Sequence, residues 1–122
     1  MARKPAKHLQ SGLKAEDQAQ RYLARRGLKL LTRNYRSPYG EIDLIMRDRN
    51  VLVFVEVRYR RDARFGLAAE TVDSRKQARL RATAEHYLIN TKGACEHPCR
   101  FDVVALAGDP AKGSLNWYPD AF

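Results

Sequence analysis

Residues 40–60 read GEIDLIMRDRNVLVFVEVRYR, and the fold class follows from this stretch. Residues 51–60 form an apolar, β-branched run that is typical of a buried strand. Residues 41–47 predict a second strand, and the segment Asp48-Arg49-Asn50 between the two predicts a turn. If Arg49 and Asn50 form a two-residue loop, the strands pair antiparallel with Asp48 opposite Val51.

Side-chain alternation then predicts which groups meet across this hairpin. Asp43 is expected opposite Glu56, and Glu41 opposite Arg58. One face of the first strand should carry Ile42, Leu44 and Met46 and the other Glu41, Asp43 and Ile45, while Glu56 should share its face with Leu52, Phe54, Arg58 and Arg60. Directly opposed side chains start with Cβ atoms about 5 Å apart, so Asp43 and Glu56 would repel each other.

A divalent cation would remove the repulsion between these carboxylates. Mg²⁺ and Mn²⁺ prefer oxygen ligands, and Mg²⁺ is often held by one or two carboxylates together with a substrate phosphate. Such a cation lowers the pKa of a coordinated water, and Arg58 could stabilise the developing oxyanion. The alternative is a structural network in which Glu41 pairs with Arg58 and the other carboxylates pair with other arginines. The apolar neighbours of Glu56 favour the metal site, because a buried carboxylate needs a metal or a close cation.

The remaining sequence predicts helices and strands around the hairpin. Helices are expected over residues 11–26 and 74–90, and further strands over residues 28–36, 100–106 and 115–118. The predicted fold is therefore α/β, a mixed β-sheet flanked by helices in the order α-β-β-β-α-β-β. Residues 1–10 are expected to be a flexible basic tail and residues 11–122 a single domain. Glu16 lies on the same helical stripe as Ala19 and Leu23, so its carboxylate should face inward.

Net charge is the strongest feature of the composition. The chain has 23 Lys and Arg residues against 14 Asp and Glu, a formal charge of +9. Such a field attracts polyphosphates, so nucleic acid is the expected partner; a composition bias without a target is the alternative. No apolar run approaches the ~20 residues that span a bilayer, and the basic start leads into no apolar signal segment. These features predict a cytoplasmic protein without a membrane partner.

The segment Cys95-Glu96-His97-Pro98-Cys99 is a second candidate metal site. Structural zinc sites usually need four ligands, and the fourth would have to come from elsewhere, such as His86. A loop with two reduced thiols is the preferred interpretation.

The motifs Gly40-Glu41-Ile42-Asp43-Leu44-Ile45 and Val53-Phe54-Val55-Glu56-Val57-Arg58 resemble the YraN-like family of small bacterial proteins. That family belongs to the PD-(D/E)xK nuclease superfamily and is similar to archaeal Holliday-junction resolvases. The likeness covers most of the chain and includes Ala15-Glu16, Arg33-Asn34-Tyr35, Phe65-Gly66, Lys76, Arg100-Phe101-Asp102-Val103-Val104 and Ala121-Phe122.

The resemblance implies a restriction-endonuclease-like fold, a homodimer, and a role for four residues. Asp43 and Glu56 would be the two acidic positions of the superfamily, Arg58 would replace its motif lysine, and Glu16 would match a helix glutamate of resolvase-like members. Arginine keeps its charge and cannot act as a general base, although it can stabilise a transition state. Lys76 is interpreted either as a compensating cation or, as is commoner for lysine, as a solvated surface residue.

A basic loop over residues 58–65 mixes cations with aromatic side chains. Its Arg60, Arg61 and Arg64, together with Lys76, are predicted to contact phosphates, and Tyr59 or Phe65 could stack on a base. Asp102 is predicted to be a structural partner for an arginine.

Together these features predict hydrolysis of a nucleic-acid phosphodiester, with DNA favoured over RNA as the partner and neither excluded. The resemblance to Holliday-junction resolvases implies branched DNA as a substrate. The cation is Mg²⁺ or Mn²⁺, held by Asp43, Glu56 and Glu16, and Arg58 faces the phosphate. Two alternatives stay open. One is a nucleic-acid-binding module that keeps the nuclease fold but cleaves little, and the other is a module whose basic face recruits an acidic protein.

Overall fold

The computed structural model describes residues 7–60, 72–108 and 113–122, and only the backbone of residues 7–13. Along the chain the elements are α1 (Lys7–Arg25), β1 (Lys29–Ser37), β2 (Gly40–Asp48), β3 (Val51–Arg60), α2 (Ser74–Asn90), the 3-10 helix η3 (Ala94–Glu96), β4 (Cys99–Ala107) and β5 (Ser114–Tyr118). Leaving aside the single turn of η3, this confirms the predicted order α-β-β-β-α-β-β. No helix in the described part of the chain is long and apolar enough to cross a membrane.

The five strands form one mixed sheet in the order β1-β2-β3-β4-β5. β3 and β4 are parallel, and the other neighbouring pairs are antiparallel. The parallel pair requires a crossover, and α2 lies within the connection. The arrangement is an α/β fold consistent with a restriction-endonuclease-like architecture.

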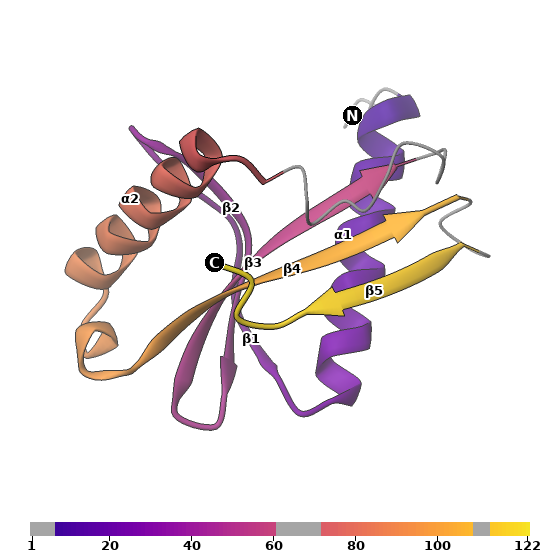
Figure 1. The fold of residues 1–122 in the computed structure, drawn as a ribbon. Coiled ribbons are helices and arrows are strands. Elements are labelled where there is room, and N and C mark those ends of the chain that lie inside the picture. The colour runs from indigo at the N-terminus through magenta and orange to yellow at the C-terminus, as the bar shows by residue number, and fades with distance from the viewer. Residues whose placement is uncertain (1–6, 61–71, 109–112) are drawn as a thin grey trace, which may run out of the picture.

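The two long helices cover opposite faces of the sheet (Figure 1). On one face, Ala15, Ala19 and Leu23 of α1 pack with Val53 and Val55 of β3. On the other face, side chains of α2 pack against Leu52 and Phe54 of the same strand, and the α2 residues in this cluster are Leu80, Ala84 and Tyr87. The alternation of β3 predicted from the sequence is therefore confirmed, and each helix covers one face of this strand.

α1 begins at Lys7, four residues before the predicted start at Ser11. The residues added to the helix are Lys7, His8, Leu9 and Gln10, of which lysine, leucine and glutamine are favourable helix formers. Helix α1 therefore extends into the segment predicted as a basic tail. α2 has the predicted bounds, Ser74–Asn90, and Asp73 caps it by accepting the backbone N–H of Lys76 at 2.8 Å.

The hairpin register is confirmed where the strands pair. Asp48 lies opposite Val51, and the register continues regularly to Leu44 opposite Val55. Beyond this pair, the Asp43 carboxylate accepts the backbone N–H of Val57 at 2.8 Å. Figure 1 shows β1 and β2 bending away from β3 at this end and running up beside α2.

This divergence makes two predictions from strict alternation wrong. Ile42 packs with Ile45 on the α2 face, whereas Leu44 lies on the α1 face, so the alternation reverses across Asp43. Glu41 is not opposite Arg58; it is the cross-strand partner of Arg36 on β1, and Arg36 Nε lies 3.5 Å from Glu41 Oε2.

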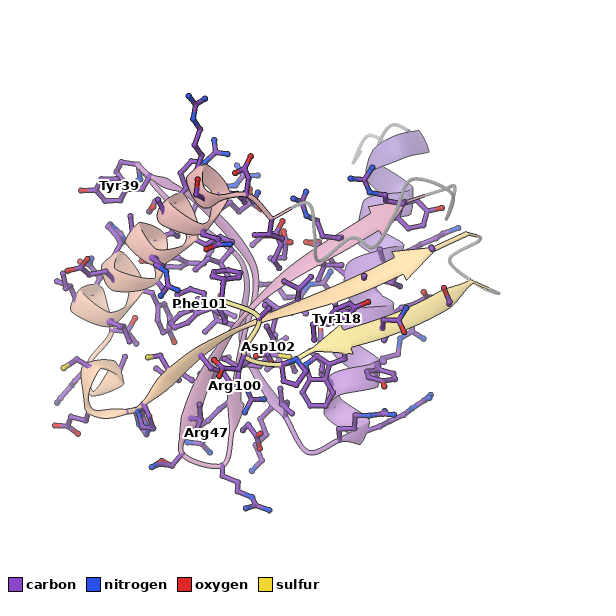
Figure 2. The ribbon with its side chains drawn as sticks, viewed as in Figure 1. Tyr39, Arg47, Arg100, Phe101, Asp102 and Tyr118 are labelled. Atoms are coloured by element: carbon purple, nitrogen blue, oxygen red, sulfur yellow. The ribbon has the colours of Figure 1, made fainter. Side chains whose placement is uncertain are left out.

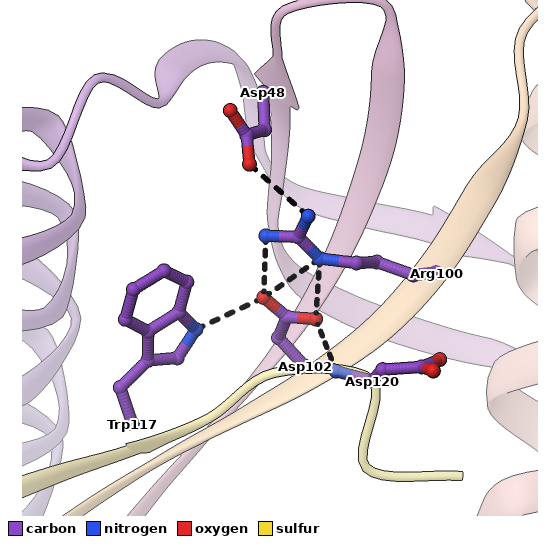
Figure 3. A network of polar contacts seen from close by, with 5 residues as sticks. All are labelled: Asp48, Arg100, Asp102, Trp117 and Asp120. Atoms are coloured by element: carbon purple, nitrogen blue, oxygen red, sulfur yellow. Dashed lines mark hydrogen bonds and ion pairs between the residues drawn. The ribbon is translucent and has the colours of Figure 1, made fainter.

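A buried polar network anchors the C-terminal segment to β4 (Figure 3). The Asp102 carboxylate, which is fully buried, accepts hydrogen bonds from Arg100 Nε at 3.0 Å, Trp117 Nε1 at 2.9 Å and the backbone N–H of Asp120 at 2.9 Å. Arg100 also contacts Asp48 Oδ2 at 3.1 Å. The prediction that Asp102 is a structural partner for an arginine is therefore confirmed.

Candidate functional site

The site lies where β2 leaves β3. Asp43 is on β2 just beyond the last regular pair, and Glu56 is on β3 one residue beyond Val55. The two carboxyl groups are close enough for the charge of Glu56 to raise the pKa of Asp43. Glu56 is 6% exposed. The two acidic side chains therefore interact across neighbouring strands, although the regular pairing ends one residue before Asp43.

Burial raises the pKa of both carboxyl groups. The pKa of Asp43 rises to about 7, first because burial disfavours the carboxylate and then because of the negative charge of Glu56. The N–H of Val57 and the charge of Lys76 oppose this rise, while Glu16 adds to it. The pKa of Glu56 also rises through burial, against the lowering effect of Lys76 and Arg58. The surroundings therefore disfavour ionisation of both carboxyl groups at once.

Two cations face Glu56 from different elements. Lys76 Nζ, in the first turn of α2, lies 3.4 Å from Glu56 Oε1, and Arg58 Nε on β3 lies 3.9 Å from the same oxygen. The Lys76 side chain is only one-third exposed. Of the two interpretations of Lys76, the contact with Glu56 agrees with a compensating cation.

Glu16 approaches the pair from α1. It is buried, as predicted, and its charge raises the pKa of Asp43. Its own pKa is also raised by burial, while the positive charge of Arg33 opposes the rise. Arg33 Nη2 lies 3.7 Å from Glu16 Oε2, and Arg33 Nη1 lies 2.6 Å from Asp17 Oδ1. These contacts join α1 to β1 and fix the position of Glu16.

Asn34 completes this side of the site, and the sequence reasoning assigned it no role. With the amide oriented so that its nitrogen donates, Asn34 Nδ2 lies 2.8 Å from Glu16 Oε1 and 3.0 Å from Glu41 Oε1. Its backbone φ is 52°, a left-handed conformation that asparagine tolerates better than most residues. Its place in the matched Arg33-Asn34-Tyr35 motif is the signal that could have identified it.

The donor set suits a hard divalent cation. Asp43 and Glu56 offer carboxylate oxygens, and a cation between them would offset both their repulsion and their burial as anions. Among the described residues, no three His, Cys, Asp or Glu side chains are grouped closely enough to form a ready cage. The two-carboxylate arrangement still fits Mg²⁺, which usually keeps several waters and gains further ligands from a substrate phosphate.

The predicted nucleic-acid contacts are described only in part. Arg61, Arg64 and Phe65 lie outside the described residues, so their predicted roles stay predictions. Arg60 ends β3. Tyr59 packs against the α1-side core and donates its hydroxyl hydrogen bond to the Gly108 carbonyl at 2.7 Å. Its predicted stacking on a base stays a prediction.

The cysteine segment shows no assembled metal site. Cys95 and Cys99 are free and exposed. His97 Nδ1 lies 2.9 Å from the carbonyl oxygen of Asn50. His86, the proposed fourth ligand, instead places Nδ1 2.5 Å from the Tyr35 hydroxyl.

Comparison with known proteins identifies the family. The family model described as "Uncharacterised protein family UPF0102" matches residues 15–106, which include α1 from Ala15, the carboxylate pair and most of β4. The chain belongs to this family. A UPF0102 protein of Nitrosococcus oceani is 53% identical over 119 residues, covering 98% of this chain and 96% of that protein. UPF0102 proteins of Pseudomonas putida (strain W619) and Pseudomonas syringae pv. syringae are 50% and 46% identical over 113 and 114 residues.

These relatives match the chain nearly end to end. The Pseudomonas putida protein is covered over 92% of its length and the Pseudomonas syringae protein over 93%. Membership of UPF0102 agrees with the resemblance seen in the sequence motifs.

Proposed function

We propose that this protein is a nuclease that hydrolyses DNA phosphodiester bonds with the help of Mg²⁺ or Mn²⁺. The observation that carries the proposal is the pair of carboxyl groups formed by the half-buried Asp43 and the buried Glu56, which interact where β2 and β3 diverge. A structural ion pair would bring opposite charges together, whereas this arrangement brings two like charges together inside the protein. The pKa of about 7 at Asp43 is the physical consequence.

Asp43 and Glu56 would hold the cation, and Glu16, whose charge raises the pKa of Asp43, would be an auxiliary carboxylate outside this pair. When bound, the cation supplies an acidified water and neutralises charge on the phosphate. The Val57 N–H fixes one Asp43 oxygen at 2.8 Å and leaves the other carboxylate oxygen to act as a ligand. Asn34 and Arg33 hold Glu16 so that it does not swing away from the site.

Arg58 and Lys76 would orient the scissile phosphate. Both lie beside Glu56, so a phosphate drawn to the site meets two positive charges at its edge. Removing one donor that stabilises a transition-state oxyanion typically costs a hundredfold or more in rate. The two cations come from β3 and α2, which allows Lys76 to offset the replacement of the motif lysine by Arg58.

The net charge of +9 supports a polyanionic substrate and predicts affinity that falls steeply with salt. The same charge favours the rival function, a DNA-binding module without cleavage, because the carboxylate charge next to Lys76 and Arg58 is already partly compensated. A metal requirement for cutting separates the two functions.

The test uses purified protein with branched, single-stranded and duplex DNA, with Mn²⁺, Mg²⁺ or EDTA. Wild type should cut only with metal, and Asp43→Asn and Glu56→Gln should each abolish cutting while DNA binding in EDTA persists. Glu85→Gln, which removes an exposed carboxylate of α2, is the matched control and should cut normally. Cleavage that survives both site substitutions would refute the assignment. Binding without any cleavage would favour the binding module.

A further inference from the structure

Tyr39 is an exposed aromatic residue at the tip of the β1–β2 hairpin. In the described part of the chain four large apolar or aromatic side chains are exposed, Leu30, Leu31, Tyr39 and Ile89, and Tyr39 is the aromatic one. It is 57% exposed. Figure 2 shows its ring projecting from the hairpin tip, beside the N-terminal half of α2. An aromatic ring in this position is available to a ligand.

The turn that carries Tyr39 is fixed to α2. Ser37 Oγ accepts the backbone N–H of Tyr39 at 3.0 Å and lies 3.1 Å from Thr83 Oγ1 on α2. Gly40 has φ of +154°, and a Cβ there would lie 3.4 Å from Thr83 Oγ1 and 3.7 Å from Arg79 Cβ. These are ordinary van der Waals distances, so it is the backbone conformation that favours glycine. Tyr39 is therefore held on a preformed support, which lowers the entropy cost of using it for binding.

The same face of α2 joins this turn to the carboxylate pair. Lys76, Arg79 and Thr83 are three and four residues apart and so lie in one row on the helix. Lys76 contacts Glu56, while Arg79 and Thr83 contact the hairpin turn. At 1.5 Å per residue, Lys76 and Thr83 are about 10 Å apart along the helix axis. Tyr39 is also four residues before Asp43, which limits their Cα atoms to a separation of about 14 Å.

Exposed arginines lie on β1 and on α2, the elements next to the turn that carries Tyr39. Arg75 and Arg79 of α2 are exposed and lie one helical turn apart. Arg36 precedes the turn, and its side chain is 81% exposed. Single-stranded nucleic acids are bound by this combination, in which cations contact the backbone and an aromatic ring stacks on a base. A base of paired duplex is already stacked on its neighbours, so a projecting ring engages most readily a base that is unpaired.

We propose that Tyr39 stacks on an unpaired DNA base and directs the carboxylate site to single-stranded or branched DNA rather than to continuous duplex. The inference rests on the proposed function in placing the scissile phosphate at Asp43 and Glu56. The upper limit of about 14 Å between the two Cα atoms corresponds to about four stacked base steps of 3.4 Å. The stacked base therefore lies within about four nucleotides of the cut.

The test measures binding in EDTA, where no cutting occurs. The probes are a forked DNA with 2-aminopurine at the first unpaired position and a fully paired duplex of the same length. Wild type should bind the fork more tightly than the duplex and quench the 2-aminopurine fluorescence. Tyr39→Ala should weaken fork binding about tenfold and abolish the quenching, while duplex binding and thermal stability stay unchanged. Tyr39→Phe keeps the ring and should behave as wild type, and Ile89→Ala, an exposed apolar side chain near the far end of α2, is the matched control.

The outcomes separate this inference from the nuclease proposal. If Tyr39→Ala binds the fork and quenches as wild type does, or loses fork and duplex affinity equally, Tyr39 does not select unpaired bases. If Tyr39→Ala weakens binding to the fork alone but Mn²⁺ never supports cutting, Tyr39 selects unpaired bases and the nuclease proposal fails. If cutting requires Asp43 but its substrate preference is unchanged in Tyr39→Ala, the nuclease stands and this inference is overturned.

Discussion

Replacing Asp43 with asparagine should stabilise the metal-free protein, and the gain should grow with pH. The pKa of Asp43 is raised from 3.8 to about 7 by burial and by the charge of Glu56. The folded protein therefore holds this proton more tightly than the unfolded chain, so folding stability falls as pH rises from about 4 to about 7. At 1.36 kcal/mol per pH unit, the rise corresponds to about 4 kcal/mol.

Asparagine removes this penalty with little change of shape. Its Oδ1 can still accept the Val57 N–H, and its Nδ2 can donate to the Glu56 carboxylate. Guanidinium denaturation without divalent cations should show Asp43→Asn more stable than wild type by about 2 kcal/mol at pH 5 and about 4 kcal/mol at pH 8. Between these pH values the difference should rise until about pH 7 and then level off.

Asp48→Asn is the matched control because it makes the same substitution on the same strand. Asp48 is paired with Arg100 at 3.1 Å, so its loss should cost about 1 kcal/mol at both pH values. Opposite signs for the two variants are expected. A destabilising Asp43→Asn, or a gain of equal size at pH 5 and pH 8, would show that Asp43 and Glu56 do not form a buried repulsive pair.

Three further predictions concern metal binding at Asp43, the Asp102 network and the charge of Arg58. Mn²⁺ should raise the thermal midpoint of wild type more at pH 8 than at pH 6, because a proton occupies Asp43 below about pH 7. In the same melting scans Mn²⁺ should leave the midpoint of Asp43→Asn unchanged. Asp102→Asn should lower the free energy of unfolding by about 3 kcal/mol, because Arg100 loses its buried charged partner. The fluorescence emission of the chain's one tryptophan, Trp117, should shift to the red. An unchanged melting curve would contradict this. In DNA cleavage assays with Mn²⁺, Arg58→Lys should retain activity and Arg58→Met should lose about a hundredfold, whereas equal rates would exclude a role for the charge.

The strand pairing at the centre of the site could be predicted because it depends on local chemistry. Asp48-Arg49-Asn50 forms a tight turn, and a two-residue loop fixes the register of everything that follows. The hydrophobic stripe of α1 likewise placed Glu16 inward, because helical periodicity does not depend on what the helix packs against. Both inferences needed only neighbouring residues.

The shape of the site could not be predicted because it depends on contacts between distant segments. Alternation assumes an unbroken ladder, but Asp43 accepts the Val57 N–H and β2 turns towards α2, so Ile42 changes face. Asn34 acquires its role only when α1 brings Glu16 within 2.8 Å of its amide. Lys76 reaches Glu56 because α2 crosses the sheet at that point, which no local pattern of the helix shows.

Charge compensation explains why these residues are arranged unevenly around the site. Glu56 has two cations within 4 Å, and Glu16 has Arg33, whereas the hydrogen bond described for the Asp43 carboxylate comes from a backbone N–H. Asp43 is therefore the carboxylate at which burial weighs most against ionisation, and its pKa of about 7 places the change of charge near neutral pH. A divalent cation at this position would compete with a single proton. Occupancy of the site would then depend on both metal concentration and pH, while Glu56 and Glu16 stay fixed by their own partners.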